Sequence, residues 1–360
     1  MNRYDIALIP GDGIGNEVIP AGLKVLQAAG ELTGSFRLNT RHFPWGCEFY
    51  LQQGRMMDPD GLKQLEPFHA IYLGAVGYPT VPDHISLWGL LLPIRQGFDQ
   101  YINLRPIRLL EGIPGPLRDK GPKEIDFVVV RENSEGEYSG HGGRSHLGRP
   151  QEVATQTTVF TRTGVERVVR YAFELARTRG PRPGAPFISA TKSNAQQYTS
   201  VLWDEVCAEV AADYPEIEWR SMLVDALAAL MVLHPERLDV VVASNLFGDI
   251  LTDLGGALQG SLGVPASANL NPERRYPSMF EPVHGSAPDI AGRGLSNPLA
   301  TIWAGSMMLD HLGEPEAARL VMRAMEQVVA RGETLTPDFG GTATTDEVAG
   351  AVIAALGNDA

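Results

Sequence analysis

Three aspartates are placed where a metal ion would suit them. Asp249 and Asp253 are four residues apart in NLFGDILTDLGGAL (245–258). If this segment is helical, both carboxylates project from one face and repel each other unless a cation lies between them. Asp225 lies in the apolar run MLVDALAALMVL, where a carboxylate is costly to bury unless it is paired or metal-bound. Oxygen ligands of this kind suit Mg²⁺ or Mn²⁺, and the alternative is a solvated acidic face.

Three arginines could hold a carboxylate-bearing substrate. Arg95 and Arg105 are ten residues apart in IRQGFDQYINLRP, and Arg131 ends the predicted strand IDFVVVRE (125–132). A guanidinium group matches a carboxylate with two parallel hydrogen bonds. Taken singly, each is more typical of a surface arginine, and Arg131 could pair with the acids of its own loop, ENSEGEYSG.

Tyr138 and Lys192 are candidates for proton transfer, because each follows a predicted strand in an α/β chain. Only five of the 30 basic residues are lysines, and Lys192 is the single lysine in the 237 residues after Lys123. Lysine can exchange protons in a site, whereas arginine effectively stays charged. Spacing alone supports this pair weakly.

The segment EPVHGSAPDIAGRGLSNP (281–298) predicts a long functional loop that leads into a helix. Its backbone amides could hold a pyrophosphate, and Asp289 could bind a ribose diol. His284 is equally compatible with a core or capping histidine. By contrast, the glycines in IPGDGIGNE (9–17) lack the spacing of a dinucleotide fingerprint, so we interpret them mainly as a tight turn beneath a helix, with a cofactor-facing loop as the alternative.

Strands and helices alternate along the chain, which predicts an α/β fold with much parallel sheet. The expected strands are 4–10, 69–77, 125–132, 186–192 and 238–245, and the expected helices are 18–31, 163–180, 201–214, 300–313 and 314–332.

The composition describes a folded chain of 360 residues that is 44% hydrophobic. The net charge of −13 argues against a nucleic-acid partner. No apolar run approaches the roughly 18 residues that span a bilayer, and the N-terminus does not resemble a signal peptide, so we expect a soluble, cytoplasmic protein without a membrane partner. Cys47 and Cys207 are expected to be buried thiols.

Together, these segments resemble the β-decarboxylating dehydrogenases, the family of isopropylmalate, isocitrate, homoisocitrate, D-malate and tartrate dehydrogenases. The matching stretches run in family order over nearly the whole chain: IPGDGIGNEV, IRQGFDQYINLRP, VRENSEGEYSG, TKSN, SNLFGDILTDL and EPVHGSAPDIAG. The resemblance implies a two-domain, isopropylmalate dehydrogenase-like α/β fold that is not a standard Rossmann fold. It implies a discontinuous cofactor-side domain (1–105 and 260–360) and a central domain (106–259) for metal, substrate and dimerisation. The implied homodimer shares active sites that lie in the cleft between domains.

The resemblance also implies a role for each candidate residue. Arg95, Arg105 and Arg131 would hold the malate-type backbone of a small dicarboxylate substrate. Asp225, Asp249 and Asp253 would hold Mn²⁺ or Mg²⁺, with Asp225 and Lys192 coming from the partner subunit. Lys192 would take the hydroxyl proton, and Tyr138 would help to protonate the enolate left after loss of CO₂. The cofactor would lie along Glu281, His284, Gly285, Ser286, Ala287, Asp289 and Asn297. Asp289 would favour NAD over NADP, and a monovalent cation such as K⁺ is a further candidate.

One segment departs from the isopropylmalate branch of the family. Trp88 occupies the position of an acidic residue in isopropylmalate dehydrogenases, although Leu91 and Leu92 of the leucine pair are kept. SLWGLLLPIRQ and NPERRYPSMFEPVHGS look closer to the tartrate and D-malate branch, so we expect NAD-dependent oxidative decarboxylation of tartrate, D-malate or both. The alternative enzyme is a 3-isopropylmalate dehydrogenase of leucine biosynthesis. A non-catalytic regulatory subunit is disfavoured by the intact tyrosine, lysine and aspartates, and an RNA-binding role by the charge.

Overall fold

The computed structural model describes residues 1–180 and 182–357 and divides the chain into two compact units. Unit 1 comprises residues 1–100, 108–122 and 256–360, and unit 2 comprises residues 101–107 and 123–255. The predicted domain bounds stay a prediction. Each unit contains its own strands and helices, as the α/β pattern of the sequence predicts.

Unit 1 is built on hydrogen-bonded strands in the order β2-β1-β3-β12-β11. Strands β1, β2, β3 and β12 run parallel where they pair, and β11 is antiparallel to β12. Their bounds are β1 Asn2–Gly11, β2 Phe36–His42, β3 Ala70–Ala75, β11 Ala266–Leu270 and β12 Ser278–Pro282. All six residues of β3 are buried, which is typical of a central strand covered on both faces.

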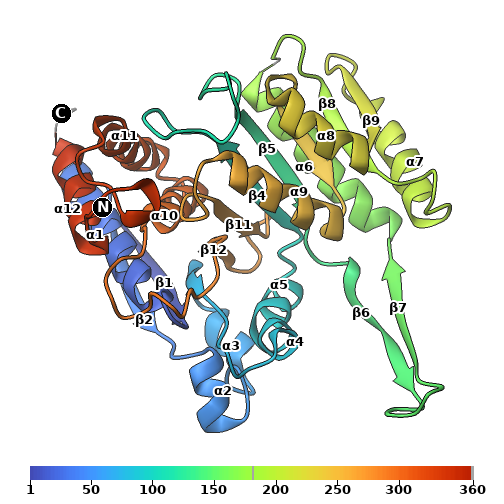
Figure 1. Ribbon diagram of the computed structural model, residues 1–360, viewed down its shortest axis with the longest axis horizontal. Coiled ribbons are helices and arrows are strands. Elements are labelled where there is room, and N and C mark those ends of the chain that lie inside the picture. The colour runs from blue at the N-terminus through green and yellow to red at the C-terminus, as the bar shows by residue number, and fades with distance from the viewer. Residues whose placement is uncertain (181, 358–360) are drawn as a thin grey trace. The chain divides into compact units, whose positions relative to one another are not determined.

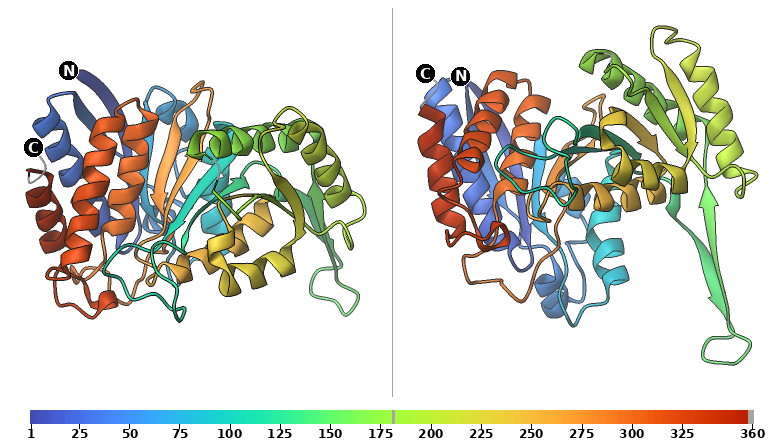
Figure 2. Two further views of the ribbon diagram at one scale, coloured as in Figure 1. Left: turned by 90° about the horizontal axis from the view of Figure 1, so that it is seen from above. Right: turned by 45° about the horizontal axis from the view of Figure 1, so that its top comes forward.

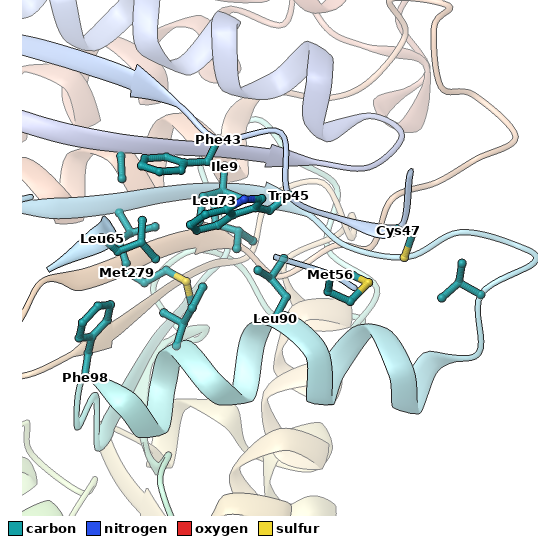
Figure 3. Packing of buried hydrophobic residues seen from close by; sticks show 14 residues of the cluster. Ile9, Phe43, Trp45, Cys47, Met56, Leu65, Leu73, Leu90, Phe98 and Met279 are labelled. Carbon is teal, nitrogen blue, oxygen red and sulfur yellow. The ribbon is translucent and has the colours of Figure 1, made fainter. Parts of the chain in front are cut away.

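The two faces of this sheet receive different helices because successive side chains of a strand point in opposite directions. Tyr72 of β3 is fully buried and donates a 2.6 Å hydrogen bond to the carbonyl of Thr301 in α10 (Leu299–His311). Its neighbour Leu73 faces a core cluster on the other side (Figure 3). There, Leu90 of the helical segment η1 (Leu87–Leu91) projects toward the strands. Phe98, which directly follows α5 (Leu92–Gly97), does the same.

Further helices complete unit 1. Helix α1 packs against α10, α11 and α12, and the short helices α2 to α4 lie in the stretch between β2 and α5 (Figure 1). Their bounds are α1 Gly15–Thr33, α2 Cys47–Gln53, α3 Gly61–Leu65, α4 Asp83–Ser86, α11 Pro315–Arg331 and α12 Thr345–Leu356. A 3₁₀ turn, η3, covers Pro337–Phe339.

The glycine-rich turn after β1 is a packing device. A Cβ on Gly11 would lie 1.9 Å from the carbonyl oxygen of Ala75, and one on Gly13 would lie 2.1 Å from that of Ser286. Both residues also have positive φ angles, 72° and 53°. Asp12 between them is buried and accepts backbone hydrogen bonds from Cys47 and Gly77 at 2.8 and 2.9 Å. The tight turn predicted from the sequence therefore accounts for these glycines.

Unit 2 contains strands in the order β4-β5-β10-β8-β9, with parallel pairing of β5 with β10, β10 with β8 and β8 with β9. Helices α6 and α7 pack against each other, and α8 packs against β8 and β9. The bounds are β4 Ile102–Arg108, β5 Asp126–Glu132, β8 Phe187–Thr191, β9 Trp219–Leu223, β10 Val240–Ala243, α6 Arg162–Arg179, α7 Thr199–Ala211, α8 Val224–Leu233 and α9 Asn245–Leu258. A 3₁₀ turn, η2, covers Pro235–Arg237.

A long antiparallel hairpin forms a separate sheet in unit 2. It consists of β6 (Gly136–Ser145) and β7 (Val153–Val159) and extends away from α6 and α7 (Figures 1 and 2). Most of its residues are exposed, including Val153 at 50%. Within the described residues the hairpin pairs with no third strand, and a two-stranded hairpin by itself is only marginally stable in water.

The strands and helices named from the sequence are confirmed, with ends that differ by at most three residues. Both cysteines are free and buried, also as predicted. In the part of the chain that the structure describes, no helix combines the length and apolarity needed to cross a membrane.

Candidate active site

The charged residues of unit 2 are positioned by the ends of two strands and by the start of one helix. The register pairs Arg131, near the end of β5, with Ala243 at the end of β10. Helix α9 begins two residues later at Asn245. The carboxyl ends of parallel strands are where α/β proteins place their sites. The helical spacing predicted for Asp249 and Asp253 is confirmed, because both lie on α9.

Arg131 is the centre of this cluster. Its side chain is only 3% exposed, and its Nε and Nη2 donate to Oδ1 of Asn245 at 3.0 and 2.7 Å. Its Nη1 forms an ion pair with Oδ1 of Asp249. Tyr138 donates from its hydroxyl to the other carboxylate oxygen of Asp249 at 2.9 Å. The predicted substrate arginine and the predicted proton donor therefore both contact Asp249, which is itself a predicted metal ligand.

Arg105 joins the same group from β4. Its guanidinium lies 3.7 Å from Asp249 and 3.7 Å from Asp253, and Nη1 donates to Oγ1 of Thr252 at 2.6 Å. Arg105 thus bridges the two carboxylates whose repulsion the sequence predicted. The two arginines and two aspartates form a balanced charge cluster, with Tyr138 at its edge.

A glycine on α9 makes the approach of helix and strand possible. A Cβ on Gly248 would lie 2.6 Å from both Cβ and Cγ of Arg131. Any larger residue would displace the arginine, so the glycine in NLFGD positions Arg131 against the helix.

The cluster shifts the pKa values of two members. Burial, the charge of Asp249 and the hydrogen bond to Asp249 raise the pKa of Tyr138 to about 12, against the opposite effect of Arg131. Partial burial raises the pKa of Asp253, Arg105 lowers it, and Asp249 raises it, so the net shift is upward. The tyrosine therefore keeps its proton at neutral pH.

Lys192 and Asp225 form a second pair in unit 2. Lys192 directly follows β8, and Asp225 lies in the first turn of α8. Nζ of the lysine donates to Oδ1 of the aspartate at 2.8 Å. This contact lowers the pKa of Asp225. Among residues 1–180 and 182–357, no group of three His, Cys, Asp or Glu side chains gathers to hold a metal ion. Within one chain, Asp249 and Asp253 are therefore neighbours on α9, whereas Asp225 is paired with Lys192.

The predicted substrate residues of unit 1 lie on and beside α5. Arg95 is buried, and its Nη2 donates to Oε1 of Glu281 at 2.7 Å, an oxygen that also accepts from Nδ2 of Asn269 at 2.7 Å. Leu91 packs on the core cluster, whereas Trp88 is 41% exposed. Both belong to the π-helical segment η1, a geometry frequent at functional sites.

The predicted cofactor segment borders a pocket of about 610 Å³ within unit 1, lined by residues 76–83 and 285–288. Nδ1 of His284 lies 3.0 Å from the carbonyl of Gly285, and burial lowers the pKa of the ring. A neutral ring that donates from Nδ1 keeps Nε2 as an acceptor, and this buried Nε2 has no hydrogen-bond partner among the described residues. Such an acceptor fits a ribose hydroxyl.

The remaining residues of that segment differ in their surroundings. Asp289 is exposed in a turn, where its carboxylate is open to a ligand. Asn297 instead accepts from the amide of Leu299 at the start of α10 and donates to Asp338 at 2.9 Å. Its polar atoms have structural partners, and its contact with a cofactor stays a prediction.

Several residues of these sites escaped the sequence analysis. Asn245 and Thr252 hold the two arginines, and Gly77 and Tyr78 line the pocket. An asparagine where a helix starts and a glycine just after a strand are signals that could have found two of them. Nothing in the sequence distinguishes Thr252 from any helical threonine.

The match to a family model decides where this arrangement belongs. Residues 5–352 match the model of isocitrate/isopropylmalate dehydrogenases. The chain belongs to the isocitrate/isopropylmalate dehydrogenase family. This confirms the resemblance and the predicted fold class, and it identifies the chain as a dehydrogenase-type enzyme.

Curated members of the isocitrate/isopropylmalate dehydrogenase family are similar over almost the whole chain. A probable tartrate dehydrogenase/decarboxylase of Agrobacterium vitis is 57% identical over 99% of this chain and 98% of its own. The D-malate dehydrogenase [decarboxylating] of Escherichia coli K12 is 56% identical over 98% of both chains. The crystal structure of isocitrate dehydrogenase from Methylococcus capsulatus matches with a TM-score of 0.87 at 36% identity, covering 98% of this chain and 99% of that one.

Proposed function

We propose that this enzyme oxidises and decarboxylates a small 2-hydroxy dicarboxylate, tartrate or D-malate, with NAD as the hydride acceptor. The observation that carries the proposal is the convergence on Asp249, where Arg131 and Tyr138 both bind and Arg105 lies nearby. Relatives named for tartrate and D-malate dehydrogenase activity, at 50–57% identity, support the substrate class.

The donor set fits a divalent cation that is completed by a substrate. Two carboxylates one helical turn apart suit Mg²⁺ or Mn²⁺, which often take one or two protein carboxylates and draw other ligands from the substrate and water. We assign Asp249 and Asp253 to this ion and Asp225 of a second copy as the third ligand. Because Lys192 is hydrogen-bonded to Asp225, the second copy would contribute both residues to the metal site.

The cofactors supply the chemistry that amino acids lack: NAD accepts the hydride, and the cation polarises the hydroxyl oxygen and the carbonyl that replaces it. Arg95, Arg105 and Arg131 bind and orient the carboxylates. Lys192 accepts the hydroxyl proton as the hydride leaves. After the β-carboxylate departs as CO₂, Tyr138 donates its proton to the carbon of the enolate, which yields pyruvate from D-malate.

The NAD site is assigned to the pocket of unit 1 and the segment that borders it, including Glu281, His284 and Asp289. We further assign Trp88 and Leu91 to the choice of substrate. A tryptophan where isopropylmalate dehydrogenases have an acid is expected to disfavour a branched substituent. Comparing turnover of D-malate, L-tartrate and 3-isopropylmalate tests the proposal, because efficient use of 3-isopropylmalate alone would support the alternative.

We also propose a homodimer with shared sites. Apolar side chains are exposed on the two helices that carry the aspartates: Val232 at 40% and Leu233 at 63% on α8, and Ile250 at 59% on α9. Exposed apolar side chains favour a protein partner, and the pair of Lys192 with Asp225, which lies at the start of the same helix α8, suits a second copy.

Hybrid dimers test the sharing directly. A dimer of one Lys192→Met chain and one Asp249→Asn chain has one intact site if the lysine serves the partner, and none if it serves its own chain. Mixing the two inactive variants should therefore restore up to half of the activity of the unmodified dimer per hybrid. No recovery after verified subunit exchange would contradict sharing.

A further inference from the structure

A second pocket of unit 1 plays no part in the proposed reaction. It measures about 270 Å³ and lies at the turn between β11 and β12, where Arg274, Arg275 and Tyr276 line it together with Tyr4, His69 and His311. This turn contains NPERRYP, which the sequence analysis associated with the tartrate and D-malate branch and to which the proposed reaction assigns no role.

Two arginines give the pocket its charge. Arg274 and Arg275 are both exposed, and within the described residues neither guanidinium forms an ion pair. Glu66 is the only acid among the described residues that line the pocket. Some exposed arginines have an acidic neighbour, such as Arg319 with Glu316 at 3.3 Å, but what distinguishes Arg274 and Arg275 is that both line the same pocket. Two unpaired guanidinium groups side by side repel each other, and an anion removes that cost.

The turn that carries these arginines is rigid. Asn271 is buried, and its Oδ1 accepts from the amide of Arg275 at 2.8 Å while its Nδ2 donates to the carbonyl of Asp99 at 3.0 Å. Arg274 has a φ of 55°, in the left-handed region that costs free energy for a residue with a Cβ. Strained residues held in place by buried hydrogen bonds occur often at ligand sites.

Two histidines line the pocket: His69 adds a hydrogen-bond donor, and the pKa of His311 responds to the charge of Arg274. Nδ1 of His69 accepts from the amide of Asp5 at 3.0 Å, so the neutral ring carries its proton on Nε2 and can donate it. Burial and the charge of Arg274 lower the pKa of His311 to about 4. The guanidinium of Arg274 thus acts on the interior of the pocket as well as on solvent.

We propose that this pocket binds a small organic dianion through Arg274 and Arg275. Two guanidinium groups match the oxygens of a phosphate monoester or of a dicarboxylate with charge-assisted hydrogen bonds. The volume admits a small molecule and excludes a macromolecule. A chain with a net charge of −13 repels anions overall, so a local cationic pocket is needed to retain one.

Calorimetric titration at low ionic strength tests the proposal with three probes: inorganic phosphate, glycerol 3-phosphate and succinate. The double variant Arg274→Gln/Arg275→Gln should raise the Kd of the preferred probe at least about tenfold, because each charged hydrogen bond contributes substantially to affinity. The control Arg118→Gln/Arg331→Gln changes the net charge equally at exposed arginines outside the pocket, and its Kd should stay within about twofold.

The choice of probe distinguishes the two sources of the dianion. Tighter binding of glycerol 3-phosphate than of succinate identifies a phosphate monoester, and the reverse identifies a dicarboxylate. If the double variant does not fold, Arg275→Gln alone retains the left-handed residue 274 and should still weaken binding by about threefold or more. The proposal is overturned if no probe binds at millimolar concentration, or if the pocket and control variants bind equally well.

Discussion

Two sites of the molecule, the α9 cluster of unit 2 and the β11–β12 turn of unit 1, use arginine in opposite ways. In unit 2, Arg105 and Arg131 are buried and held by oxygen atoms of α9. At the β11–β12 turn of unit 1, Arg274 and Arg275 are exposed, and neither forms an ion pair with an acid of residues 1–180 or 182–357. Buried, paired charges are fixed in position before a ligand arrives, which suits chemistry that needs defined geometry. Exposed, unpaired charges suit the capture of an ion from solvent.

The same comparison separates catalysis from recognition within the proposed reaction. In that proposal, unit 2 supplies the groups that transfer protons and hold the cation, together with Arg105 and Arg131, whereas unit 1 adds Arg95 for the substrate carboxylates. The predicted cofactor segment of unit 1 offers mainly backbone groups, the neutral His284 and the exposed Asp289. Substitutions in unit 2 should therefore lower kcat, whereas those in the cofactor segment should change affinity and cofactor choice.

The largest effect is expected for Lys192. If it accepts the hydroxyl proton, Lys192→Met should lower kcat by roughly 10²–10⁴ with little change in substrate KM. Lys192→Arg should not restore activity, because arginine stays protonated at any working pH. Single-turnover measurement of NADH formation is the readout.

Lys24 offers a matched control, because it forms a similar exposed pair with Asp346 at 2.7 Å in unit 1. Lys24→Met should leave kcat unchanged. An undiminished NADH burst in Lys192→Met would remove the lysine from the base role.

A somewhat smaller loss is expected for Asp249. Asp249→Asn removes a carboxylate from the proposed metal site and from Arg131 and should lower kcat by about 10²–10³ without rescue by excess Mn²⁺. The same change leaves a buried guanidinium with a weaker partner, so thermal stability should fall as well. Asp213→Asn, which breaks the exposed pair with Arg170, should alter neither quantity greatly. Full activity of Asp249→Asn in EDTA would exclude a metal role.

The sequence was sufficient for elements with a strong pattern. The apolar run of β3 and the amphipathic repeat of α11 admit few alternatives, because burial of their apolar residues dominates local preferences. The positions of Asp249 and Asp253 on one helix face could also be predicted, because helical spacing is a local property.

The contacts within the cluster could not be predicted in the same way. That Arg131 binds Asn245 and Asp249 depends on the register of β5 with β10 and on the close approach at Gly248. These are long-range properties, and short patterns do not encode them. The alternative of a salt bridge between Arg131 and an acid of its own loop follows from proximity in the sequence alone.

In unit 1, the exposed Asp289 should influence cofactor choice more than rate. A carboxylate beside the ribose accepts its hydroxyl hydrogen bonds and repels a 2′-phosphate. Asp289→Asn should reduce the ratio of kcat/KM for NAD to that for NADP by about tenfold, mainly through KM. Asp310→Asn, an exposed acid on α10, is the control. An unchanged ratio, or a native preference for NADP, would contradict this assignment.

The smallest effect is expected for His311, which ends α10 and lines the same pocket as Arg274. It is a dependence of protein stability on pH. Burial and Arg274 lower the pKa of His311 from 6.5 to about 4. Between these two values the unfolded chain binds a proton that the folded chain does not. The free energy of unfolding should therefore fall as the pH decreases from 6.5 toward 4, by at most about 3 kcal/mol from this residue. His311→Gln removes the titrating group and should flatten that part of the profile, whereas His42→Gln, an exposed histidine, should not. Urea unfolding at several pH values measures the slopes. Equal slopes for the His311 variant and the unmodified protein would show that neither burial nor the charge of Arg274 lowers the pKa of His311 enough to affect stability.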